Sequence, residues 1–173
     1  KIVSPQASHK TEVGGVALNL CDSAAVITSA LDMEARLKVA EPEAIVEGFL
    51  VQEMVSGVEV ILGVREDPQF GPFMVVGLGG VLVEAMQDVS FRMLPVSEED
   101  AKEMLGELRG KAILGAFRGA SPRDIESLVK AICGLSDFFA SHREFLADLE
   151  VNPLIVGAKG EGVRAVDVRP IWR

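Results

Sequence analysis

The chain has 173 residues, with 26 acidic and 17 basic side chains and a formal net charge of −9. Apolar residues make up 49% and charged residues 25%, which is typical of a globular domain and excludes a disordered tail, a collagen-like repeat and a disulfide scaffold. The negative charge argues against nucleic acid as the main partner, because phosphate binding requires net positive charge or a basic patch.

The two cysteines, Cys21 and Cys133, lie far apart in the sequence and lack metal-ligand spacing. So few cysteines in an acidic chain are typical of a reduced, cytoplasmic protein. No apolar run is long enough to span a membrane. The chain opens on Lys1, without an initiator Met and within what reads as the end of a strand. We therefore expect a fragment of a larger polypeptide.

The first 44 residues predict a short α/β unit. A Pro and a Gly pair mark the early loop. Asp22 is a good N-cap, and the apolar residues after it recur at helical spacing until Pro42 ends the helix. We expect a strand over 1–3, a loop over 4–15, a strand over 16–20 and a helix over 23–39.

From residue 45 the pattern is rich in strands, with two helices. Ser97 and Asp100 form a capping box, and Ser121-Pro122 reads as a second helix start. A mixed α and β class with antiparallel strand pairs follows. We expect strands over 45–54, 58–64, 73–78, 89–94, 149–156 and 163–168, a turn over 67–72, a Gly-rich loop over 157–162, and helices over 97–109 and 121–142.

The last hairpin brings oxygen-bearing side chains together. Asp148, Glu150 and Asn152 alternate onto one face of their strand. If the hairpin is symmetric about the centre of its loop, Asn152 faces Asp167 with Cβ atoms about 5 Å apart. Two such ligands suit Mg²⁺, with water and phosphate completing the shell. The alternative is a hydrogen-bonded Asn–Asp pair at the end of a sheet.

Other candidates allow a structural and a functional interpretation. His9 precedes Gly14-Gly15, a setting that suits anion binding or simply an exposed loop histidine. The run Gly77–Gly80 after a buried strand indicates a tight turn or close backbone packing. Glu59 lies among apolar strand residues, where alternation can place it on a solvated face. The sequence contains no Ser–His–Asp order, C-x-x-C or H-E-x-x-H pattern, so the hydrolase and zinc interpretations lose support.

Several blocks along the chain carry a family pattern together. The blocks are Val3–Val16, Val51–Val55 with Gly57–Glu59, Asp67–Pro72, Gly77–Gly80, Asp88–Arg92, Glu150–Leu154 and Val166–Asp167. In this order they resemble the NDP-forming (ADP-forming) acyl-CoA synthetases, which are distant relatives of the succinyl-CoA synthetase β subunit. Because the blocks span nearly the whole chain, the resemblance is far more specific than any single glycine motif.

The resemblance implies an α+β ATP-grasp fold, in which two subdomains hold ATP. It implies that residues 1–44 are part of the N-terminal subdomain, whose start is missing. Residues 45–173 would be the C-terminal subdomain, with the adenine hinge and the magnesium hairpin.

The resemblance also implies roles for particular residues. Lys1 resembles a lysine that contacts nucleotide phosphate, and Glu59 an acidic residue near the ribose and phosphates. Asn152 and Asp167 correspond to the Mg²⁺ ligands. Two residues receive catalytic roles: Glu150 resembles the carboxylate that orients a phosphohistidine, and His9 a second histidine that takes the phosphoryl group. The adenine edge would be read by the backbone of Glu53, Met54 and Val55.

The implied reaction is acyl-CoA + ADP + phosphate ⇌ acid + CoA + ATP, through an acyl phosphate and a phosphohistidine. The chain would supply the ATP-binding part of this ligase, with Mg²⁺ as cofactor and ATP or ADP as substrate. Its partners would be the CoA-binding and phosphohistidine-bearing domains or the α subunit, with no nucleic acid and no membrane. Two alternatives remain: a synthetase-like regulatory or ligand-sensing domain of a protein lysine acetyltransferase, and a non-catalytic nucleotide-binding module.

Overall fold

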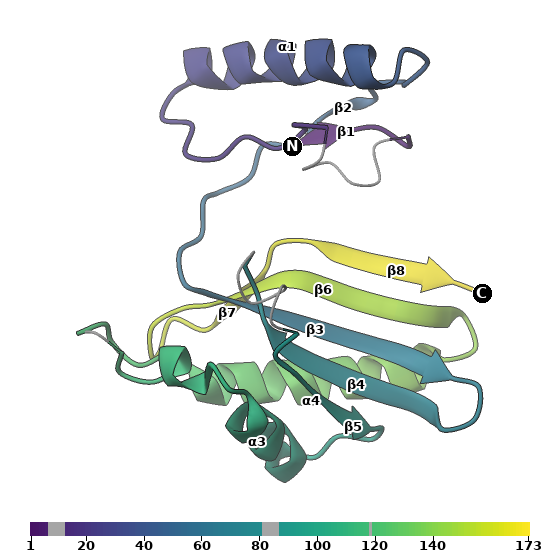
Figure 1. The fold of residues 1–173 in the computed structure, drawn as a ribbon, viewed down its shortest axis with the longest axis vertical. Coiled ribbons are helices and arrows are strands. Elements are labelled where there is room, and N and C mark those ends of the chain that lie inside the picture. The colour runs from purple at the N-terminus through teal and green to yellow at the C-terminus, as the bar shows by residue number, and fades with distance from the viewer. Residues whose placement is uncertain (7–12, 81–86, 118) are drawn as a thin grey trace. The chain divides into compact units, whose positions relative to one another are not determined.

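The computed structural model describes residues 1–6, 13–80, 87–117 and 119–173. The chain divides into two compact units, Lys1–Met54 and Val55–Arg173. Figure 1 labels the elements of both, and each unit is described by itself. Within the described residues, no helix is both long and apolar enough to cross a bilayer.

The first unit packs one helix on a two-stranded sheet. Strand β1 (Ile2–Val3) pairs antiparallel with β2 (Gly48–Phe49). Helix α1 (Ser23–Ala40) begins where Asp22 accepts a hydrogen bond from the Ala25 N–H at 2.8 Å, so the predicted cap is confirmed. Its buried side chains Met33 and Leu37 form a small core with Ile2.

Two strands expected in this unit differ from the prediction. Residues 16–20 form no strand, because Asn19 has a φ of 58°, in the left-handed region, and interrupts the extended backbone. The run 45–54 contains only the short β2. After β2 the chain continues without a helix or strand to residue 57. The apolar residues of this segment therefore did not indicate pairing in a sheet.

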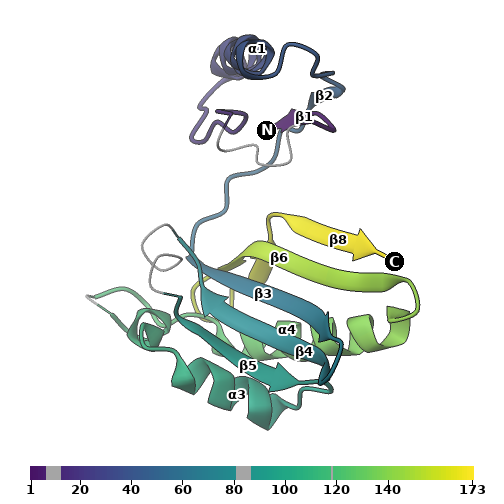
Figure 2. The same cartoon turned by 45° about the vertical axis from the view of Figure 1, so that its right-hand side comes forward.

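The second unit is an antiparallel sheet (Figure 1, Figure 2). The strand order is β5-β4-β3-β6-β7, and β8 also pairs with β6. The predicted turn is confirmed between β3 and β4, where Asp67 accepts hydrogen bonds from the backbone N–H groups of Gln69 and Phe70. The strands are β3 (Val58–Asp67), β4 (Gly71–Leu78), β5 (Val89–Met93), β6 (Leu146–Val156), β7 (Val163–Ala165) and β8 (Val168–Trp172).

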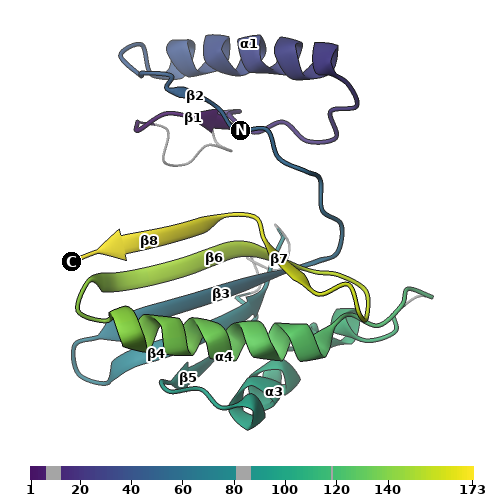
Figure 3. The same ribbon diagram turned by 180° about the vertical axis from the view of Figure 1, so that it is seen from behind.

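Helices cover one face of this sheet (Figure 3). They are α3 (Glu98–Glu107) and α4 (Ile125–His142), with a short 3₁₀ turn, η1 (Lys111–Leu114), between them. Alternate residues of β3 point into the core that α4 closes. The intervening residues, Ile61, Gly63 and Arg65, therefore lie on the opposite face, on which no described helix of this unit packs. We call this the open face.

Of the two helix starts predicted in this unit, one is correct and one is wrong. The capping box between Ser97 and Asp100 is confirmed. The second helix begins at Ile125, capped by Asp124, and not at Ser121-Pro122. Arg123 forms a β-bridge with Ala158, so this residue pairs with another segment and does not join the helix. The Asp124 carboxylate accepts from Ser127 N and also from Gly160 N and Gly162 N, so it ties the helix to the last loop.

Candidate functional site

Asn152 and Asp167 lie opposite each other, as the hairpin pattern predicts. Leu154 pairs with Ala165 on one side of them, and Val151 pairs with Val168 on the other. Between these pairs, Asn152 N donates to the Asp167 carbonyl oxygen at 3.0 Å. The predicted register is therefore confirmed.

The Asn152 amide has a defined orientation. Its Nδ2 donates to Glu150 Oε1 at 3.2 Å. A carboxylate only accepts hydrogen bonds, so the amide nitrogen must face Glu150 and Asn152 Oδ1 is left for another partner. The Asp167 side chain is exposed, and its carboxylate makes no hydrogen bond or ion pair with any described residue. Both residues thus offer an oxygen to a ligand.

These oxygens fit a magnesium ion. Mg²⁺ takes hard oxygen ligands, often only one or two from the protein, and completes its shell with water and phosphate. Among the residues with a described placement, no group of three or more His, Cys, Asp and Glu side chains has metal-binding geometry. Asn152 and Asp167 would therefore supply two ligands and leave the remaining positions to solvent and nucleotide.

Two arginines flank Glu150 on the open face. In the sheet register Glu150 lies between Gly63 of β3 and Arg169 of β8. Arg169 donates to Glu150 Oε2 at 2.8 Å, and an Arg65 guanidinium nitrogen lies 3.9 Å from the same oxygen. Arg65 Nε lies 3.1 Å from Asp148 Oδ2. The hairpin register that predicts the Asn152–Asp167 pair also places Arg169 opposite Glu150, but the sequence analysis did not single Arg169 out. Arg65 comes from β3, which is distant in the sequence, so no local pattern could predict its position beside Glu150.

Glu59 lies at the start of β3, beside the glycine run. Its carbonyl accepts a hydrogen bond from Gly79 N at 2.8 Å. A Cβ atom on Gly79 would lie 2.8 Å from the Cβ of Glu59, too close for any other residue. Close backbone packing, one of the two structural interpretations of this run, is therefore confirmed at Gly79. The Glu59 side chain is exposed.

The remaining predicted site residues lie at the two ends of the first unit, at the start of the second unit, or outside the described residues. Lys1 pairs through its backbone with Leu50, at 2.9 and 2.8 Å. Glu53 and Met54 are exposed and Val55 is half-buried, in a segment without a helix or strand. Their backbone groups make no hydrogen bond with another described residue. His9 lies outside the described residues.

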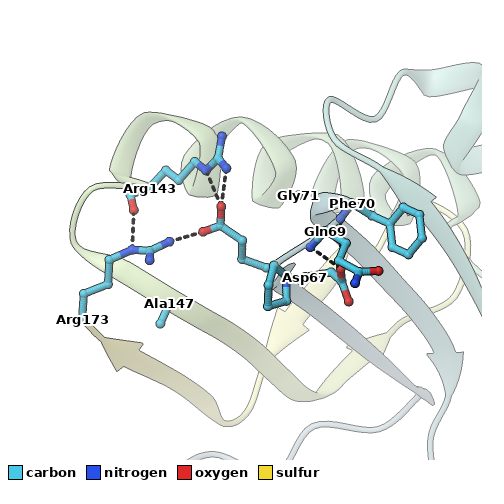
Figure 4. A pocket seen from close by; sticks show the side chains of 9 residues that line it. Asp67, Gln69, Phe70, Gly71, Arg143, Ala147 and Arg173 are labelled. Carbon is cyan, nitrogen blue, oxygen red and sulfur yellow. Dashed lines mark hydrogen bonds and ion pairs between the residues drawn. The ribbon is translucent and has the colours of Figure 1, made fainter.

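A shallow pocket lies at the β3–β4 turn, where Figure 4 shows Arg143 and Arg173 side by side and joined by a hydrogen bond. Arg143 Nε donates to Glu66 Oε1 at 3.0 Å, and Arg173 Nε to the Arg143 carbonyl oxygen at 2.9 Å. Arg173 also donates to Glu66. The hydrogen bond from Arg143, followed by that from Arg173, lowers the pKa of Glu66. These groups satisfy one another and fasten the chain end to β3.

The fold agrees with comparisons to known proteins. The model of the ATP-grasp domain family matches residues 1–171. The chain is an ATP-grasp domain, as the sequence blocks predict.

The relatives define the family more closely. The chain is 37% identical over 174 residues to the β subunit of ADP-forming acetate–CoA ligase II of Pyrococcus furiosus, covering 100% of this chain and 74% of that one. It is 39% identical over 175 residues to ADP-forming acetate–CoA ligase I of Archaeoglobus fulgidus, covering 99% of this chain but 24% of the relative. The chain belongs to the family of the ADP-forming acyl-CoA synthetases, of which it is the ATP-grasp part.

Solved structures give the same assignment. Acetyl-coenzyme A synthetase 1 of Ca. Korarchaeum cryptofilum, in complex with coenzyme A, Ca-AMPCP and HgCl⁺, matches with a TM-score of 0.91 and 42% identity, covering 100% of this chain and 75% of that one. Another structure of that enzyme contains coenzyme A and Mg-AMPPCP, with a phosphohistidine segment pointing towards the nucleotide site. It matches with a TM-score of 0.81 and 38% identity, again over 100% and 75%.

Proposed function

We propose that this domain transfers a phosphoryl group between ATP and a histidine, as the nucleotide-binding part of an ADP-forming acyl-CoA synthetase. The whole reaction would be acyl-CoA + ADP + phosphate ⇌ acid + CoA + ATP. The observation that carries the proposal is the group formed by Glu150, Asn152 and Asp167 on the last hairpin. Family membership supports it, because relatives with this reaction in their names match nearly the whole chain.

Asn152 Oδ1 and the Asp167 carboxylate would hold Mg²⁺. When bound, the ion would neutralise charge on the nucleotide phosphates, which is a main requirement of phosphoryl transfer. The ammonium group of Lys1 would add a second positive charge to the phosphates. The backbone of Glu53, Met54 and Val55 would read the adenine edge, and Glu59 would lie towards the ribose.

Glu150 would hold the histidine. A carboxylate that accepts a hydrogen bond from one imidazole nitrogen keeps the other nitrogen unprotonated and nucleophilic. That nitrogen would form a bond to the γ-phosphorus as the bond from phosphorus to the ADP oxygen breaks. The imidazole proton stays on the nitrogen facing Glu150, so no further base is needed.

His9 would provide a second acceptor. We propose that it takes the phosphoryl group in transit between the nucleotide and the histidine of another domain. The partners would be the CoA-binding and phosphohistidine-bearing domains or the α subunit of the same synthetase. The Korarchaeum synthetase contains such a phosphohistidine segment.

The test is a labelling experiment on the intact synthetase that contains this chain. Incubation with γ-³²P-ATP and Mg²⁺ is expected to give a protein label that is stable to base, labile to acid and removed by ADP. Absence of label from a protein that binds ATP would contradict phosphoryl transfer. It would support a regulatory domain or a non-catalytic nucleotide-binding module instead.

A further inference from the structure

The Glu150 carboxylate is held at both of its oxygens. Oε1 accepts from Asn152 Nδ2 at 3.2 Å, and Oε2 accepts from Arg169 at 2.8 Å. The Glu150 side chain is 22% exposed and that of Arg169 60% exposed, so the contact lies at the surface of the open face. Its two partners come from its own strand and from β8.

In this part of the open face, two carboxylates share two arginines. Asp148 and Glu150 alternate onto the same face of β6, about 7 Å apart along the strand. Arg65 binds Asp148 at 3.1 Å and reaches only to 3.9 Å from Glu150. One buried oxygen of Asp148, Oδ1, has no hydrogen-bond partner. Arg65 is therefore committed mainly to Asp148, and Arg169 is the nearest described cation for Glu150.

We propose that Arg169 is a positioning residue that acts through Glu150, an inference that rests on the proposed function. Without Arg169, the attraction of a cation held by Asn152 and Asp167 would draw Glu150 towards the metal. Glu150 would then no longer face the histidine. Arg169 thus holds the Glu150 carboxylate towards the histidine and away from the metal. Glu150 can then orient the histidine while Asn152 and Asp167 bind the metal.

The experiment compares three variants of the intact synthetase. Arg169→Gln removes the charge, Arg169→Lys keeps it, and Arg164→Gln is the matched control. Arg164 lies on the adjacent edge strand β7, is exposed, and forms no ion pair with a described carboxylate. Three quantities are measured: phosphohistidine formation from γ-³²P-ATP, the Mg²⁺ dependence of AMPPCP binding, and the melting temperature.

Arg169→Gln is expected to slow phosphohistidine formation by about 10- to 100-fold, the range found for partners that orient a site residue. In this variant Glu150 would add a negative charge beside the cation site. The Mg²⁺ concentration needed for AMPPCP binding is therefore not expected to increase. Arg169→Lys is expected to recover most of the rate, and Arg164→Gln to behave as wild type.

Two results would overturn the role of Arg169. One is labelling by Arg169→Gln at the rate of Arg164→Gln. The other is an equal loss in the Gln and Lys variants together with a lower melting temperature and weaker AMPPCP binding, which indicates a structural role. Absence of label from the wild-type protein would instead refute the proposed function, so the two failures are distinguishable.

Discussion

Asn152 and Asp167 are joined across the last hairpin by a hydrogen bond of 3.0 Å between their backbones. This bond fixes the two residues opposite each other at the point where β7 ends and β8 has not yet begun. Their side-chain oxygens are left without a described protein partner, whereas the charged groups around Glu66 satisfy one another. The contrast favours a ligand-binding role for the first pair.

Asn152→Ala and Asp167→Ala test this role in the intact synthetase. Each removes one oxygen ligand, so each is expected to raise the dissociation constant of the Mg²⁺–nucleotide complex by about 10-fold or more. Calorimetric titration with AMPPCP at several Mg²⁺ concentrations measures it.

Asp137→Ala is the control for these two variants, because Asp137 is exposed on α4 and lies outside the site. It is expected to bind as wild type does. If both site variants keep the Mg²⁺ dependence of the wild-type protein, the metal assignment is wrong.

The fold was predictable where local signals decide the structure. Asp22 and the Ser97–Asp100 box located two helix starts, and alternation with loop symmetry set the hairpin register. The start of α4 was missed because Arg123 bridges to Ala158, a contact invisible in the local sequence. Strand β8 was missed because its residues are all exposed and include Pro170, which is tolerated only at a sheet edge.

The part of the candidate site that lies on one hairpin was predictable from the sequence, whereas the part contributed by a distant strand was not. Glu150, Asn152 and Asp167 lie on one hairpin, so strand period and loop symmetry suffice to bring them together. Arg65 comes from β3, a strand paired with β6 across a long sequence separation. No period within either strand encodes that pairing, and the arginine became visible only in the folded sheet.

His9→Ala is expected to separate binding from chemistry. If His9 accepts the phosphoryl group, its loss leaves AMPPCP affinity within about 2-fold of wild type, because the nucleotide does not depend on it. The same variant reduces overall turnover by at least about 100-fold, in line with loss of a covalent acceptor. Both values are measured on the intact synthetase, in the acyl-CoA to ATP direction.

The second histidine of the chain provides the control for that experiment. His142 lies at the end of α4, exposed and stacked on Phe138 at 4.3 Å between ring centroids. His142→Ala is expected to keep full turnover. Wild-type turnover in His9→Ala would contradict the proposed role of His9 as a phosphoryl acceptor.

The ionised Glu107 carboxylate is expected to make the stability of the folded chain depend on pH in the acid range. Hydrogen bonds from Arg92, and then from Ser90, lower the pKa of this α3 carboxyl from 4.5 to about 2. A lowered pKa means that the folded state favours the charged form. Its stabilising contribution is therefore complete above about pH 4.5 and is lost as the pH falls towards about 2.

Glu107→Gln is expected to lower the urea midpoint of the chain near neutral pH, and the difference from wild type should shrink as the pH falls towards about 2 and vanish below it. Glu103→Gln is the matched control, since Glu103 is more exposed and contacts Arg92 at a longer distance, 3.3 Å against 2.6 Å. Its effect should be smaller throughout. A wild-type-to-Glu107→Gln difference that stays constant across this pH range would refute the assignment.

Two adjacent phenylalanines of α4 test which helix face supports the sheet. Phe139 is fully buried in the core, whereas Phe138 is 47% exposed. Phe139→Ala leaves a cavity beneath the sheet and is expected to lower the free energy of unfolding by about 3–5 kcal/mol. Phe138→Ala loses only its surface contacts and should cost about 1 kcal/mol or less.

Urea unfolding followed by far-ultraviolet circular dichroism measures both costs. Because the two substitutions remove the same side chain from neighbouring positions of one helix, changes in helix propensity cancel in the comparison. Equal costs would mean that α4 does not present Phe139 to the core. The helix would then not support the sheet whose open face carries Glu150, and the separation of that face from the core would be wrong.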